Sequence, residues 1–142
     1  MLDTIYTQVA AVITLLVCGF AFWKGGRPEQ WGGGVVILAQ LSTVLLQDFL
    51  GTDQMALAAF GADAAVLIAL GVIAWKSEQS WPAWASACQA ITVAVHLAKL
   101  LDFRIAPFAY MSALAIAFYG MVLALAIGTF VAWREREALS PR

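Results

Sequence analysis

The stretch 106–133, APFAYMSALAIAFYGMVLALAIGTFVAW, contains no charged side chain from its first residue to its last. A helix needs about 20 predominantly apolar residues to cross the hydrocarbon core of a bilayer, so this stretch predicts a membrane-spanning helix. Pro107 falls in its first turn, where a missing backbone N–H costs nothing, and so marks a helix start. Four further stretches approach the same length and apolarity, at 4–23, 31–50, 55–75 and 81–102. The sequence therefore predicts an all-α transmembrane bundle of five spanning helices.

The composition of the whole chain agrees with this class of protein. Of its 142 residues, 63% are hydrophobic and 12% are charged, and the mean hydropathy is +0.84. A soluble domain usually carries about 25% charged residues. Because the connections between the predicted helices are short, we expect 1–142 to form a single transmembrane domain. The net charge of −1 and the lack of a long basic run argue against nucleic acid as a partner and leave membrane lipids.

The positive charges predict the orientation, because Lys and Arg accumulate in the short cytoplasmic loops of membrane proteins. With five crossings, Lys99 and Arg104 fall on one side, and the other side receives Lys24, Arg27, Lys76, Arg134, Arg136 and Arg142. The second side is predicted to be cytoplasmic, which places the N-terminus outside and the C-terminus in the cytoplasm. The first stretch lacks a basic n-region and a small-residue cleavage site, so we expect a retained helix. The short loops favour a multi-pass protein of a bacterial inner membrane.

The tryptophans indicate the same boundary, since indole rings prefer the headgroup level of a bilayer. All of them fall at the predicted cytoplasmic ends of helices: Trp23, Trp31, Trp75, Trp81, Trp84 and Trp133. We therefore expect these six side chains to be interface anchors.

Small residues recur at every fourth position in two of the predicted helices, where they allow helix backbones to approach closely. The two sets are Gly61, Ala65 and Ala69 in the third helix, and Gly120, Ala124 and Gly128 in the fifth. This spacing predicts tight packing against a partner helix. The partner is either another helix of this chain or a second copy, and the sequence leaves both alternatives open.

Polar side chains share one face of the predicted helix 81–102, where Gln89, His96 and Lys99 follow helical spacing. At 1.5 Å per residue, the carboxylate of Asp63 falls at a similar depth in the third predicted helix. The second predicted helix contributes Thr43 and Gln47 to the same outer half of the bundle. These side chains are expected to form one polar cluster.

An unpaired charge in a bilayer costs at least about 2.5 to 3.5 kcal/mol, so we expect Asp63 to bond to His96 or Lys99. The Gln and Thr side chains would complete the network. Two interpretations follow from this arrangement. The pair either locks the register of neighbouring helices or exchanges a proton, as in the relays of pumps and carriers.

These features favour two functions, and a membrane enzyme stays open as a third alternative. Small size, short loops and the lack of a recognisable reaction motif favour a non-enzymatic subunit of a membrane complex, either an accessory or a homo-oligomeric subunit. The alternative is a proton-coupled or pH-gated small carrier or channel for an ion or solute, with Asp63, His96 and Lys99 as its site. Cys18 and Cys88 lack metal-site spacing. The sequence implies no cofactor, and a lipid, quinone or pigment in the polar pocket stays an open alternative.

Overall fold

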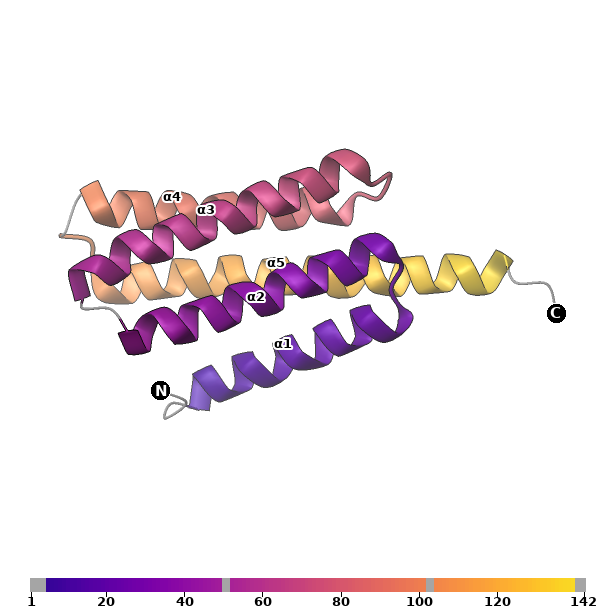
Figure 1. The fold of residues 1–142 in the computed structure, drawn as a ribbon, viewed down its shortest axis with the longest axis horizontal. Coiled ribbons are helices and arrows are strands. Elements are labelled where there is room, and N and C mark those ends of the chain that lie inside the picture. Colours follow the sequence, from indigo (N-terminus) through magenta and orange to yellow (C-terminus); the bar gives the residue numbers. More distant parts are fainter. Residues whose placement is uncertain (1–4, 50–51, 102–103, 140–142) are drawn as a thin grey trace.

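The computed structural model describes residues 5–49, 52–101 and 104–139, and all regular structure in these ranges is helical. The prediction of an all-α chain with five helices is therefore confirmed (Figure 1). The helices are α1 (Ile5–Lys24), α2 (Arg27–Phe49), α3 (Thr52–Lys76), α4 (Trp81–Leu101) and α5 (Pro107–Leu139).

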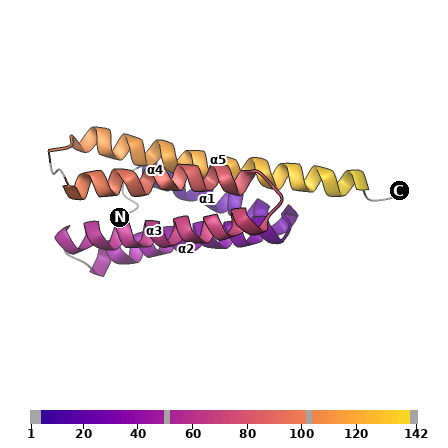
Figure 2. The same ribbon diagram turned by 90° about the horizontal axis from the view of Figure 1, so that it is seen from above.

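The five helices run antiparallel to their neighbours in the chain and form a closed bundle. Each helix packs against the next one, and α1 closes the bundle by packing against both α2 and α5. In Figure 2, α4 and α5 lie together in one layer, and α2 and α3 lie together in the other. One end of the bundle, here called the tryptophan end, contains Lys24, Arg27, Lys76 and Trp81. The other end, where α4 ends and α5 begins, is called the histidine end.

Three helices extend by three or more residues beyond their predicted bounds, at polar residues. The second helix begins at Arg27 rather than near residue 31, the third begins at Thr52 rather than at 55, and the fifth runs to Leu139 rather than to 133. Pro28 suits the first turn of a helix, and the Glu and Arg residues after Trp133 are good helix formers. Hydropathy finds the apolar part of a helix and misses such polar ends.

Membrane-spanning capacity is clear for three of the five helices. Among the described residues, the segments that are long and apolar enough to cross a bilayer are Leu57–Lys76, Trp81–Leu101 and Pro107–Leu139. The prediction of five spanning helices is therefore supported only in part. The apolar segment Gln8–Lys24 of α1 is shorter, and α2 opens with a polar turn and carries Gln40 and Thr43 in its second half.

The core of the bundle depends on the residues of α4 that face inward. They are Trp81, Ala85, Gln89 and His96, at steps of four and seven that keep one helix face buried. The indole of Trp81 is only 4% exposed, because it lies between α2 and α5. Its ring occupies the space that a Cβ atom would need at Gly32 and at Gly128. Two glycines on two helices therefore form the seat of this one side chain.

Replacing Gly128 with alanine should destabilise the bundle. A Cβ at this position would lie 2.7 Å from the Cβ of Trp81 and closer still to its ring, so α4 and α5 must separate. We expect Gly128→Ala to lower the free energy of unfolding by about 1–3 kcal/mol, as overpacking usually does. SDS titration of the protein in mixed micelles measures this quantity.

Gly71→Ala is the matched control, since no other part of the chain lies within 4 Å of a Cβ at Gly71. We expect this control to keep or slightly raise stability, because alanine favours a helix over glycine by about 0.5–1 kcal/mol. Equal free energies of unfolding for the two variants would contradict the close packing of Trp81 against Gly128.

Candidate functional site

A chain of polar side chains links three helices near the histidine end. Asp63 on α3 accepts a hydrogen bond at Oδ2 from Nε2 of His96 on α4, at 2.9 Å. The other ring nitrogen, Nδ1, lies 2.7 Å from the hydroxyl of Tyr110 on α5. The imidazole is buried, whereas the side chain of Asp63 keeps 24% of its surface exposed. The arrangement therefore joins a partly exposed carboxylate to a buried imidazole and a phenol.

Gln89 completes the contacts of Asp63. Its Nε2 donates to Oδ1 of Asp63 at 2.9 Å and lies 3.2 Å from the backbone carbonyl of the same residue. Both carboxylate oxygens of Asp63 therefore accept a hydrogen bond, one from an amide and one from an imidazole. This satisfies a carboxylate that would be costly to leave unpaired in an apolar environment.

The geometry allows two protonation patterns of the histidine. A neutral imidazole with its proton on Nε2 donates to Asp63 and accepts at Nδ1 from the Tyr110 hydroxyl. An imidazolium donates from both nitrogens, and the Tyr110 hydroxyl must then turn to act as the acceptor. The Tyr110 hydroxyl on α5 can therefore serve His96 either as a donor or as an acceptor.

Two of the other residues predicted for the polar cluster, Lys99 and Thr43, donate hydrogen bonds to backbone carbonyls. The Lys99 ammonium donates to the backbone carbonyl of Ile105 at 3.2 Å and so links α4 to the turn before α5. Thr43 is exposed and donates to the carbonyl of Ala39 at 3.0 Å, so the prediction that Thr43 joins the cluster is wrong. Threonine can satisfy its hydroxyl within its own helix in this way. The side chain of Gln47 lies outside the part of the chain that the structure describes.

Tyr110 belongs to this series of hydrogen bonds but was not among the site residues predicted from the sequence. Its hydroxyl and ring both contact His96, with ring centroids 5.6 Å apart. A tyrosine near a membrane boundary usually finds a hydrogen-bond partner when its ring is buried. Its position one turn into α5 and close to the end of α4 was the available signal.

A second buried polar pair lies at the tryptophan end and joins α2 to α4. Glu29 is 0% exposed and accepts at Oε1 from the indole Nε1–H of Trp81, at 2.9 Å. Its other oxygen, Oε2, accepts from the backbone N–H of Gly26 at 2.7 Å. Glu29 is the third residue of α2, and its carboxylate bonds to the backbone N–H of Gly26, the residue before the helix. This is one half of a capping box.

The burial of Trp81 corrects its assignment as an interface anchor, and the reason is the partner that its N–H finds in Glu29. Four other tryptophans are exposed on the surface of the bundle: Trp23, Trp31, Trp75 and Trp84. Trp133 is half-buried, with its ring at an edge-on angle to Phe20 and with the ammonium of Lys24 5.2 Å from its centre. All six lie toward the tryptophan end.

The small residues of α5 and α3 face different surroundings. In α5, a Cβ at Gly120 would lie 2.8 Å from Sγ of Cys88 on α4, and Gly128 receives Trp81. Ala124 packs against the same core. In α3, by contrast, Gly61 and Ala65 are exposed, and no described residue outside the helix's own backbone and the chain neighbours lies within 4 Å of a Cβ at Gly61. Ala69 is half-buried. The α5 set is therefore used inside the chain, and the first two residues of the α3 set face outward.

An apolar layer separates the two polar pairs. Leu70 on α3, Ala85 on α4 and Leu125 on α5 are each no more than 1% exposed, and Met121 packs with them. In α4, Ala85 lies between Trp81 and Gln89 and so separates the contacts of Glu29 from those of Asp63. The polar chain at the histidine end therefore stops at a closed hydrophobic core.

The chain has no match among protein-family models, curated proteins or solved structures. The described residues contain no group of three or more His, Cys, Asp or Glu side chains that could hold a metal ion. The features that bear on function are therefore the geometry of the two polar pairs and the exposed faces of the helices.

A double-mutant cycle should detect direct coupling between Asp63 and His96. We expect Asp63→Asn and His96→Gln to show an interaction energy of about 0.6 kcal/mol, with an upper bound of about 1.7 kcal/mol, as interhelical hydrogen bonds in membranes do. SDS titration of the native protein, both single variants and the double variant measures it.

Pairing Asp63→Asn with Thr43→Val provides the control, because Thr43 bonds within its own helix. These two changes should add to within about 0.3–0.5 kcal/mol. An Asp63–His96 coupling no larger than this control would show that the pair does not stabilise the bundle.

Proposed function

We propose that this chain is a multi-pass integral membrane protein that acts as a non-enzymatic subunit of a membrane complex, either as a homo-oligomer or as an accessory of another membrane protein. The observation that carries this proposal is the outward face of α3, where Gly61 and Ala65 are exposed. Helices in lipid associate through close backbone approach rather than through hydrophobic burial. Since α4 already fills the glycine positions of α5, α3 is the helix that offers small residues to a partner.

The proposed topology has five crossings, an outer N-terminus and a cytoplasmic C-terminus in a bacterial inner membrane. The distribution of cations supports it, because the tryptophan end contains Lys24, Arg27, Lys76, Arg134 and Arg136. Most short-loop cations lie on the cytoplasmic side of membrane proteins. The four exposed tryptophans at the same end would lie at headgroup level. Although α2 is less apolar, its packing against α1, α3 and α5 reduces its contact with lipid.

The apolar layer favours a subunit over a conduit. A path for protons or ions must contain polar groups or water along its length. The bonded series of Gln89, Asp63, His96 and Tyr110 borders the buried apolar side chains of Leu70, Ala85 and Leu125, which separate it from the Glu29–Trp81 pair. In the proposed function, the hydrogen bonds among these four side chains therefore fix the positions of α3, α4 and α5.

Cysteine cross-linking in native membranes tests the role of α3. We expect Ala65→Cys to form a disulfide-linked dimer, or an adduct with a specific membrane protein, on oxidation with copper phenanthroline. The control is Ile116→Cys on α5, a residue that is 74% exposed on another face and should stay monomeric. The parent chain, with Cys18 and Cys88, gives the background. A wholly monomeric Ala65→Cys protein would contradict the proposal.

A proton-linked carrier is the second candidate, and the polar chain itself favours it. The partly exposed carboxylate of Asp63, the imidazole of His96 and the phenol of Tyr110 form an unbroken series of hydrogen bonds across three helices. Ionisable residues inside membrane bundles often mark proton pathways. This candidate requires the apolar layer to open during transport.

Vesicles with an entrapped pH-sensitive dye distinguish the two candidates. A carrier should show a proton flux that Asp63→Asn abolishes and Tyr110→Phe slows, because the first change removes the ionisable carboxylate and the second removes the hydroxyl that bonds to His96. Thr43→Val should leave the flux unchanged. If the native protein gives no flux under any imposed gradient, the carrier fails and the subunit proposal stands.

A further inference from the structure

A groove of about 660 Å³ lies between α2 and α3 at the tryptophan end. Its walls are apolar and consist of Val35 on α2 and Ala69, Val72 and Ile73 on α3. The volume falls within the range of about 300–1,000 Å³ that is usual for small-molecule sites. Such walls suit a hydrocarbon chain.

Two cations, Arg27 at the start of α2 and Lys76 at the end of α3, stand at the polar end of this groove. Both side chains are exposed, and neither has a hydrogen-bond or ion-pair partner among the residues that the structure describes. The groove lining contains no carboxylate. The site therefore combines an apolar channel with two unneutralised positive charges at one end.

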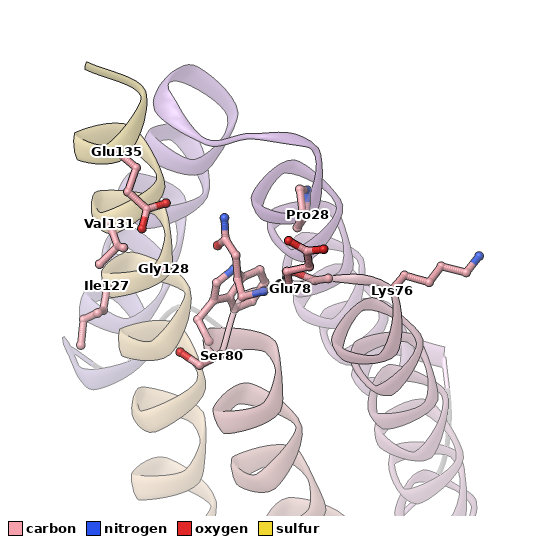
Figure 3. A pocket seen from close by; sticks show the side chains of 11 residues that line it. Pro28, Lys76, Glu78, Ser80, Ile127, Gly128, Val131 and Glu135 are labelled. Atoms are coloured by element: carbon pink, nitrogen blue, oxygen red, sulfur yellow. Dashed lines mark hydrogen bonds between the residues drawn. The ribbon is translucent and has the colours of Figure 1, made fainter. Parts of the chain in front are cut away.

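Two carboxylates at this end of the bundle line a neighbouring cavity instead of the groove. Glu78 and Glu135 line this cavity of about 650 Å³ beside the α3–α4 connection, and Lys76 borders both the cavity and the groove. Figure 3 shows the side chain of Lys76 extending away from both of them. Glu29 is fully buried and bonded to Trp81 and Gly26. Within the described part of the chain, none of these carboxylates forms an ion pair with Arg27 or Lys76.

We propose that this groove binds an anionic phospholipid, with the phosphate between Arg27 and Lys76 and one acyl chain along Val35, Ala69 and Ile73. The guanidinium fork of arginine matches phosphate oxygens, and lysine adds a second charge. Trp31, which lines the groove and is 71% exposed, lies where an indole would meet the headgroup region. An anionic lipid is favoured over a zwitterionic one because no carboxylate is present to receive a choline ammonium group. The inference depends on the proposed membrane embedding.

Native mass spectrometry of the delipidated full chain tests this site, with phosphatidylglycerol and phosphatidylcholine as probes. We expect tighter binding of phosphatidylglycerol by the native protein. The double variant Arg27→Gln/Lys76→Gln should weaken that binding by about tenfold or more, since each cation near an anionic headgroup contributes substantially to lipid affinity. Binding of phosphatidylcholine should not change.

Two controls separate the groove from general surface charge. Lys24→Gln/Arg134→Gln removes the same charge at the same end outside the groove and should keep the preference for phosphatidylglycerol. Ala69→Phe fills the groove and should weaken lipid binding while both cations remain. Ala90→Phe, at an exposed position on α4 outside the groove, should not weaken lipid binding.

Equal binding of the two lipids by the native protein, or equal losses in the two double variants, would overturn the lipid site. Extraction of membranes with alkaline carbonate is measured in parallel. If the protein resists extraction and shows no lipid preference, only the lipid site is contradicted. If carbonate releases the protein, both the lipid site and the proposed function are contradicted.

Discussion

Burial of the Trp81 indole sets the geometry of the tryptophan end of the bundle. The ring requires glycine at both Gly32 and Gly128, and its N–H requires an acceptor inside an apolar core. Glu29 supplies that acceptor from the first turn of α2 and also bonds to the backbone ahead of the same helix. One side chain thereby fixes the distances of α4 from α2 and from α5. A buried donor or acceptor without its partner would cost about 1–3 kcal/mol.

The same requirement explains the polar chain at the histidine end. Asp63, His96 and Tyr110 come from three different helices. Each of them forms a hydrogen bond with a polar group of a neighbour that apolar surroundings would leave without a partner. The two polar pairs hold opposite ends of the bundle, with Leu70, Ala85 and Leu125 packed between them. Their directional bonds specify the register of α2 to α5, and the apolar layer adds contact without specifying register.

Apolar runs in the sequence were sufficient to predict five helices and their order, because run length and breakers are local properties. The proximity of Asp63 and His96 was also predictable, since helix rise places them at one depth. The partners Tyr110 and Glu29 were not predicted, because contacts between helices depend on rotation about each helix axis. Trp81 was assigned to the bilayer surface for the same reason: its five fellow tryptophans share its depth, and only packing distinguishes the one that turns inward. Helix ends such as 134–139 were missed because polar residues continue a helix without adding hydropathy.

Helix α5 extends past the other helices at its C-terminal end, as Figure 1 shows. It is held about two thirds of the way along, where Gly128 meets Trp81, and near its start, where Tyr110 meets His96. At 1.5 Å per residue, Tyr110 lies about 27 Å from Gly128 and Leu139 lies about 16 Å beyond it. An uninterrupted helix pivoting at Gly128 is a lever with unequal arms. A sideways step of the Tyr110 phenol would be reproduced at Leu139 in the opposite direction with about three-fifths of the amplitude.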